Sequence, residues 1–96
     1  MTEARSLSIL GSTGSIGTSA LSVVAHANAQ ETEPVFEIDT LCAGKNVDLL
    51  IEQALHFRPT HVVIADESQL DALRVGLSGL DIEIAGGAGA VIEAAT

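Results

Sequence analysis

Hydrophobic positions along the chain alternate between two spacings, which divide it into strands and helices. A short apolar run at 7–10 is typical of a strand. Across residues 16–29, hydrophobic positions recur every three or four residues, which predicts a helix. The polar stretch 28–34 ends in a proline and predicts a surface loop.

The same alternation continues through the middle of the chain. Residues 35–43 are rich in β-branched and apolar side chains and predict a second strand. Asn46 can cap a helix that runs through residue 56, because apolar positions from Val47 onward repeat at i, i+3, i+4 and i+7. A proline break then precedes a third predicted strand at 61–65.

The last third of the chain predicts one more helix and strand, and then the start of a further helix. Asp66 can act as an N-cap with Gln69 at the spacing of a capping box, and the helix ends by Gly79. Residues 81–85 predict a fourth strand, a glycine-rich turn follows, and a helix begins at about residue 90.

Strands and helices that alternate at this spacing predict a parallel sheet covered by helices. We therefore expect an α/β, Rossmann-like fold with helices on both faces of the sheet, in three α/β/α layers. Right-handed crossovers would keep neighbouring helices on a common face until the strand order reverses. The pattern stops within its fourth helix, so we expect residues 1–96 to be a truncated part of a longer protein or half of a doubly wound fold.

The stretch LGSTGSIG places Gly11, Gly14 and Gly17 directly after the first predicted strand. A tight strand-to-helix turn needs the backbone freedom of glycine, a second glycine lets a ligand approach the main chain, and a third lets the helix pack closely on the strand. The helix start leaves unpaired N–H groups and the positive end of the helix dipole, both of which a pyrophosphate satisfies.

This turn therefore predicts a dinucleotide site, in which Ser12, Thr13 and Ser15 can add hydroxyl donors around the anion. The spacing is G-x-x-G-x-x-G and differs from the commoner G-x-G-x-x-G. A glycine turn without a ligand is the alternative interpretation.

The end of the second predicted strand indicates which dinucleotide is bound. NAD-binding proteins carry Asp or Glu there, whereas this chain has Gly44, Lys45 and Asn46. A lysine presents a cation where a 2′-phosphate would lie, which favours NADP(H); Asn46 can donate to the same phosphate or cap the following helix. Asp39 falls inside the strand and is not assigned a ribose-binding role. The alternative is that Lys45 is an ordinary solvated lysine.

Composition narrows the possible partners. The chain has 13 acidic and four basic residues, a net charge of −9, which disfavours nucleic acid and anionic membranes as partners. The single cysteine, Cys42, cannot form an internal disulfide and fits a reducing compartment and a place in the core. No apolar stretch approaches the roughly 18 to 20 residues that span a bilayer, and no secretory signal is evident, so we expect a cytoplasmic protein.

Other candidates carry less chemistry. The three histidines, at 26, 56 and 61, have no acid or cysteine at ligand spacing, so the sequence predicts no metal site. The glycines at 86, 87 and 89 either border the cofactor crevice or form a plain turn.

The segments ILGSTGSIG, CAGKN and NVDLLIEQALHFRPTHVVIAD together resemble the 1-deoxy-D-xylulose 5-phosphate reductoisomerase family. The resemblance extends over nearly the whole chain, from about Leu7 onward. It implies that residues 1–96 are the N-terminal NADPH-binding domain, with the catalytic and C-terminal domains elsewhere. The implied pyrophosphate and nicotinamide contacts are Thr13, Gly14, Ser15 and Ile16, and the implied contacts to the 2′-phosphate are Gly44, Lys45 and Asn46.

The resemblance implies NADPH-dependent rearrangement and reduction of a sugar phosphate, 1-deoxy-D-xylulose 5-phosphate, to 2-C-methyl-D-erythritol 4-phosphate. It also implies a homodimer and a divalent metal, Mg²⁺ or Mn²⁺, bound outside this segment; no catalytic or metal residue is assigned within it. Residues 1–96 alone are not expected to turn over substrate. Three alternatives remain: another NADP-dependent Rossmann reductase or semialdehyde dehydrogenase, a non-catalytic nucleotide-sensing module, and a fragment with no retained ligand affinity.

Overall fold

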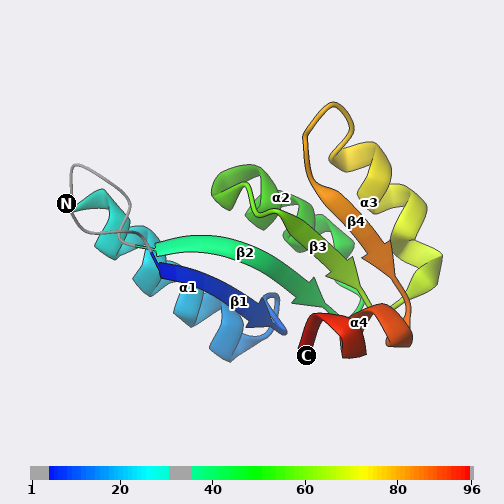
Figure 1. The fold of residues 1–96 in the computed structure, drawn as a ribbon, viewed down its shortest axis with the longest axis horizontal. Helices are drawn as coiled ribbons and strands as arrows, with labels where there is room; N and C mark the ends of the chain where they lie inside the picture. Colours follow the sequence, from blue (N-terminus) through cyan, green and yellow to red (C-terminus); the bar gives the residue numbers. More distant parts are fainter. Residues whose placement is uncertain (1–4, 31–35, 96) are drawn as a thin grey trace.

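The chain forms a four-stranded parallel sheet with helices on both faces (Figure 1). The computed structural model describes residues 5–30 and 36–95. In chain order, the elements are β1 (Arg5–Leu10), α1 (Ser15–Ala29), β2 (Phe36–Ala43), α2 (Val47–Phe57), β3 (His61–Ile64), the 3₁₀-helix η1 (Glu67–Gln69), α3 (Leu70–Gly76), β4 (Glu83–Gly86) and α4 (Ala88–Ala95). The predicted α/β, Rossmann-like fold is confirmed.

The strands lie in the sheet in chain order, β1-β2-β3-β4, and every neighbouring pair is parallel. Each crossover therefore steps in the same direction, and the right-handed rule carries α1, α2 and α3 to one face. Val62 and Ile64 of β3 pack into the core on that face. Val63 points the other way and lines a groove with Ala90 of α4, so α4 covers the opposite face.

A bulge in β2 determines which side chains face the helices. The pairing with β1 shifts between Leu7, opposite Ile38, and Ser8, opposite Thr40, so Asp39 is the extra residue. Strict alternation would turn Ile38 and Leu41 to opposite faces. The bulge lets both join the core.

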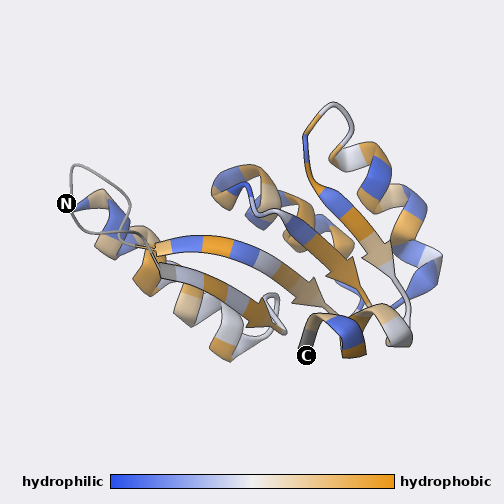
Figure 2. Ribbon diagram, in the orientation of Figure 1, coloured by the Kyte–Doolittle hydropathy of each residue, from blue (hydrophilic) through white to orange (hydrophobic). Residues whose placement is uncertain are grey.

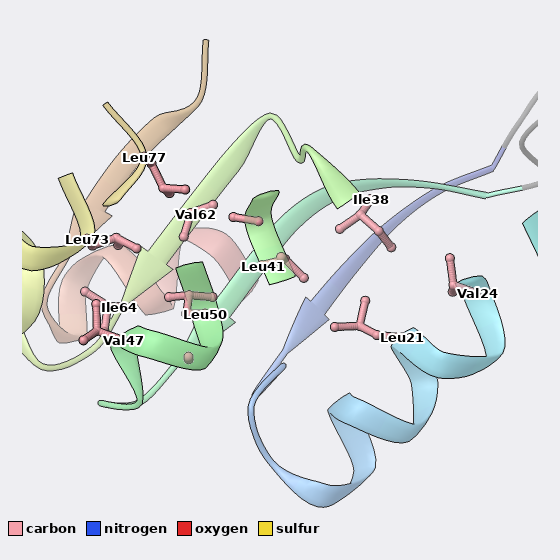
Figure 3. Packing of buried hydrophobic residues seen from close by; sticks show 12 residues of the cluster. Leu21, Val24, Ile38, Leu41, Val47, Leu50, Val62, Ile64, Leu73 and Leu77 are labelled. Atoms are coloured by element: carbon pink, nitrogen blue, oxygen red, sulfur yellow. The ribbon is translucent and has the colours of Figure 1, made fainter. Parts of the chain in front are cut away.

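The hydrophobic core lies between the sheet and α1–α3 (Figure 3). Hydrophobic and hydrophilic positions alternate along the first half of β2 (Figure 2), whereas the half that follows the bulge is buried throughout. The buried members of the core are Leu21, Val24, Ile38, Leu41, Ala43, Val47, Leu50, Ala54, Val62, Ile64, Leu73 and Leu77. Burying each large aliphatic side chain contributes roughly 1.5–3 kcal/mol, and this apolar layer holds the carboxyl ends of the strands in place.

The predicted boundaries are wrong mainly in the last third of the chain. The predicted helix after Asp66 is divided into η1 and α3 and ends at Gly76. Asp66 is the N-cap residue of η1, so that prediction is confirmed. Its side chain accepts a hydrogen bond from Ser68 N at 3.0 Å and not from Gln69 N, as the expected capping box requires. β4 begins two residues later than predicted, and α4 begins at Ala88, inside the predicted turn.

Two more boundaries differ near the beginning of the chain. β1 starts at Arg5, before the apolar run, because pairing with β2 continues past it. Residues 31–35, which hold most of the predicted loop and the first residue of the predicted second strand, lie outside the described residues.

Candidate functional site

The backbone turns sharply where β1 ends, and this turn is fixed from the side of β2. Gly11 has φ +76°, in the left-handed region that favours glycine. The Gly11 and Ser12 N–H groups both donate to the Cys42 carbonyl, at 2.7 and 2.8 Å. The predicted role of the first glycine is confirmed.

The third glycine allows α1 to lie against the turn. A β-carbon at Gly17 would lie 2.7 Å from Ser12 Cα and closer still to the Gly11 carbonyl oxygen. Side chains cannot occupy that space, so glycine at this position is a packing requirement. Gly14 is different, because its β-carbon would meet Gly11 O at 3.4 Å, an ordinary contact.

The amino end of α1 is open to solvent. Gly14 is the N-cap residue, in an extended conformation, and within residues 5–30 and 36–95 no side chain caps the helix there. The first turn carries no acidic residue, and Gly14, Ser15 and Ile16 are exposed, with Ile16 85 % accessible. Backbone N–H groups and the positive end of the dipole thus face outward, as a bound phosphate requires.

The segment after β2 lies at the same edge of the sheet as the glycine turn, because Leu10 and Cys42 are paired near the ends of adjacent parallel strands. Gly44, Lys45 and Asn46 are all exposed. Asn46 Oδ1 accepts from Leu49 N at 3.3 Å, so the predicted cap of α2 is confirmed. This cap uses the amide oxygen and does not use the Nδ2 group.

Lys45 gives this edge its positive charge. All four basic residues of the chain are described: Arg5 begins β1, Arg58 follows α2 and Arg74 is in the last turn of α3. These three positions are nearer the amino ends of the strands. A ligand phosphate at the carboxyl edge would therefore meet one cationic side chain, Lys45.

Asp66, at the end of β3, belongs to the same edge. Its N–H donates to the Gly44 carbonyl at 2.8 Å, which ties the ends of β2 and β3 together. The Ser68 hydroxyl and N–H, with a smaller effect of the Lys45 charge, lower the pKa of Asp66 below its usual value. The carboxylate is thus ionised, and it accepts hydrogen bonds from the N–H and the hydroxyl of Ser68.

The seven predicted cofactor contacts all lie at this edge: Thr13, Gly14, Ser15, Ile16, Gly44, Lys45 and Asn46. The expectation that the Ser12 hydroxyl faces the anion is wrong, because Ser12 is fully buried beneath the turn. Asp39 lies in the interior of β2, as predicted, where it accepts from the Thr40 hydroxyl at 2.8 Å.

One polar residue at the site was missed by the sequence analysis. Gln53 Nε2 donates to the Ser12 carbonyl at 2.8 Å, in a buried contact between α2 and the glycine turn. The available signal was a polar residue three positions after Leu50 and one before Ala54, on the apolar face of a predicted helix.

A second polar group lies on the opposite face of the sheet, beside α4. His61 is 3.0 Å from Glu83 and 3.8 Å from Asp39. The groove there is lined by acidic side chains, including Glu93, which disfavour an anionic cofactor. Across the described ranges, no group of three or more His, Cys, Asp or Glu residues could hold a metal ion. None of the helices seen in the structure is long and apolar enough to cross a membrane.

The chain matches known proteins over nearly its full length. The family described as 1-deoxy-D-xylulose 5-phosphate reductoisomerase matches residues 7–96. The protein of that name from Caulobacter vibrioides is 50 % identical over 95 residues, covering 99 % of this chain and 23 % of the relative. The one from Phocaeicola vulgatus is 44 % identical over 89 residues, covering 93 % and 22 %.

Solved structures agree with these matches. The Zymomonas mobilis reductoisomerase in complex with NADPH superposes with a TM-score of 0.87 at 35 % identity, covering 99 % of this chain and 24 % of that one. A reductoisomerase with NADPH, fosmidomycin and magnesium superposes at 0.81 and 31 % identity, covering 95 % and 21 %. The chain thus spans less than a quarter of the length of these relatives, and it belongs to the 1-deoxy-D-xylulose 5-phosphate reductoisomerase family.

Proposed function

We propose that this chain binds NADPH and is the cofactor-binding part of a 1-deoxy-D-xylulose 5-phosphate reductoisomerase. The observation that carries the proposal is the open amino end of α1 at Gly14, beside the one cation of the same edge, Lys45. Its 35 % identical structural neighbour is a complex with NADPH, which supports the same ligand here.

The proposed contacts follow from the charges of NADPH. The pyrophosphate would accept hydrogen bonds from the backbone N–H groups of Thr13, Ser15 and Ile16, whereas the Gly14 N–H already donates to the Gly11 carbonyl at 3.0 Å. The first turn of α1 carries no acidic residue to oppose this anion. The 2′-phosphate would lie against Gly44, Lys45 and Asn46, with the Lys45 ammonium as its counter-charge. The exposed Ile16 side chain offers an apolar surface to the nicotinamide side of the cofactor.

The whole enzyme would rearrange and reduce the sugar phosphate 1-deoxy-D-xylulose 5-phosphate to 2-C-methyl-D-erythritol 4-phosphate. NADPH supplies the hydride in such a reaction. The residues of this chain would bind and orient the cofactor. A divalent metal, Mg²⁺ or Mn²⁺, would act as a Lewis acid in another part of the enzyme; magnesium is present in solved relatives. We do not expect residues 1–96 alone to catalyse the reaction.

We further propose a homodimer for the whole enzyme and a cytoplasmic location. The single buried cysteine supports a reducing compartment. The net charge of −9 disfavours nucleic acid and anionic membranes as partners. The family match favours the reductoisomerase over a semialdehyde dehydrogenase or a nucleotide-sensing module.

Isothermal titration of the 96-residue chain with NADPH and with NADH tests the proposal. We expect NADPH to bind at least about tenfold more tightly, because it alone carries the 2′-phosphate that Lys45 would meet. The preference should shrink as salt is added, since an exposed charge pair is screened. Equal affinities for the two cofactors, or no binding of NADPH by the folded chain, would overturn it.

A further inference from the structure

Gln53 is a buried polar side chain on the apolar face of α2. It is 8 % exposed and shares that face with Leu50 and Ala54, both completely buried. An amide in such a place loses its hydrogen bonds to water, which lowers the stability of the fold unless the protein supplies other partners. A leucine would satisfy the packing of this face more simply.

The partner of Gln53 is the backbone of the glycine turn. Its Nε2 donates to the Ser12 carbonyl at 2.8 Å, and the Ser12 N–H donates to the Cys42 carbonyl at 2.8 Å. Both polar backbone groups of Ser12 are therefore held from below. The orientation of the following peptide units, which lead to Gly14, depends on these two bonds.

The buried contact between Gln53 and the glycine turn includes polar atoms that do not contribute to stability. Ser12 Oγ and Gln53 Oε1 are buried and make no hydrogen bond within the part of the chain that the structure describes. Polar groups in this state reduce stability, and apolar residues of the same shape would remove the penalty. Their presence under the turn indicates a role in setting its geometry.

α2 also carries the other half of the site. It begins at Val47, immediately after Gly44–Asn46, and Gln53 lies less than two turns further along. The Gln53 hydrogen bond thus joins the helix that positions Lys45 to the turn that precedes α1. This side chain adds a second link between the two proposed phosphate contacts, beside the hydrogen bonds from Gly11 and Ser12 to the Cys42 carbonyl.

We propose that Gln53 is a positioning residue for NADPH. Its amide holds the Ser12 carbonyl so that the N–H groups of Thr13, Ser15 and Ile16 face the pyrophosphate, while the Gly14 N–H stays bonded to the Gly11 carbonyl at 3.0 Å. The inference rests on the proposed function and adds a residue that need not touch the cofactor.

The test compares two ligands on the 96-residue chain. NADPH reports on both halves of the site, whereas adenosine 2′-monophosphate lacks the pyrophosphate and reports on the Lys45 side alone. We expect Gln53→Met to weaken NADPH binding by about tenfold while the affinity for adenosine 2′-monophosphate changes by less than about twofold. Calorimetry measures the first affinity and NMR titration the second.

A matched control separates positioning from general stability. Ile38→Val removes one buried methylene from the core at the far end of β2 and lowers stability without touching the turn. It should leave both affinities unchanged. Circular dichroism checks that each variant is folded; should Gln53→Met not fold, Gln53→Asn, which keeps the amide but is too short to reach Ser12, takes its place.

The outcomes are distinct. A selective loss for NADPH supports the role of Gln53. An unchanged NADPH affinity in a folded variant, or equal losses for the two ligands or in Ile38→Val, overturns it. If the unmodified chain binds NADPH no better than NADH, the proposed function fails instead, whatever the Gln53 variants show.

Discussion

Two corners of this molecule have the same backbone plan, and one of them is suited to an anion. In each, a strand of the parallel sheet ends in a glycine with positive φ, Gly11 at +76° and Gly87 at +99°. The N–H of each glycine donates to a carbonyl on the neighbouring strand, to Cys42 at 2.7 Å and to Ile64 at 2.9 Å. Each corner then leads into a helix, α1 or α4.

The surroundings of the two corners differ. Between Gly11 and α1 there is a loop that ends at Gly14, whereas α4 starts directly after Gly87. Beneath the first corner lies the Gln53 amide, which donates to the turn. Against the second lies the Glu67 carboxylate, in the space that a β-carbon of Gly87 would occupy.

This difference shows that glycine at a strand-to-helix corner allows the backbone to turn, and that the turn alone does not make a phosphate site. What distinguishes the first corner is a loop between the strand and the helix, a donor below that loop, and no acidic residue in the first turn of α1. The second corner would place a carboxylate next to any bound anion. The plain-turn interpretation of the second glycine cluster is therefore the better one.

The largest expected difference between the two corners is in stability, and it is tested by a substitution at Gly17. Gly17→Val would force atoms of the side chain into the backbone of Gly11 and Ser12, and α1 would have to move away from the turn. We expect a loss of at least about 3 kcal/mol in the free energy of unfolding. Urea denaturation followed by circular dichroism measures it.

The second corner supplies the control for that change. A β-carbon at Gly89, in the first turn of α4, would meet no described atom within 4 Å. Gly89→Ala should raise stability by about 0.5 kcal/mol, because alanine is the better helix former. Equal destabilisation at the two positions would mean that the corners are packed alike.

Gly14→Val tests whether the first corner binds the pyrophosphate of NADPH. Gly14 has φ −77° and ψ 171°, which any residue adopts, so the variant should fold. Its side chain would cover the open amino end of α1 and block the pyrophosphate. We expect NADPH affinity to fall about a hundredfold, or about 2.7 kcal/mol, measured by titration calorimetry. A folded variant with unaltered affinity would show that the phosphate binds elsewhere.

Lys45→Ala tests the charge at the first corner. We expect NADPH to bind about tenfold more weakly, because a charge-assisted contact to the 2′-phosphate is lost, while NADH binding stays the same. Glu67→Gln, which removes the acid from the second corner, should leave both affinities within about twofold at moderate salt. Losses of equal size for NADPH and NADH in Lys45→Ala would contradict the assignment.

The sequence predicted the alternation of elements and the first corner well, because both depend on local patterns. The spacing of Gly11, Gly14 and Gly17 specifies a turn geometry, and each of the two outer glycines has the steric role expected of it. The cap by Asn46 was likewise a local signal.

What the sequence left out depends on contacts between distant residues. Ser12 and Gln53 are 41 residues apart in the sequence, and no periodic pattern between them indicates that the two are bonded. The bulge at Asp39 and the burial of Ser12 follow from how β1 pairs with β2, which no single segment encodes. The division of the predicted helix into η1 and α3 likewise has no sign in the spacing of its hydrophobic residues.

The smallest expected effect is a pH dependence of stability that arises from the Cys42 thiol at the first corner. Burial raises the pKa of the Cys42 thiol above its ordinary value of 9.0, and the Gly11 N–H opposes this with a smaller effect. The unfolded chain therefore loses the thiol proton first, and the folded protein binds more protons above about pH 9. Stability should fall as pH rises through that region and should be unaffected by this group below it.

At the second corner Ile64 occupies the position that Cys42 has at the first, and its side chain has no proton to lose. The fall of stability with pH that arises from the thiol must therefore come from the first corner. Urea denaturation at pH 8 and pH 10 gives the difference, and thiolate absorbance at 240 nm gives the pKa directly. Cys42→Ala should remove the part of the pH dependence that arises here and leave the rest. A pKa of the Cys42 thiol at or below its ordinary value in the folded chain would mean that solvent reaches this side chain. The glycine turn would then not close over the end of β2, as the two hydrogen bonds to the Cys42 carbonyl require.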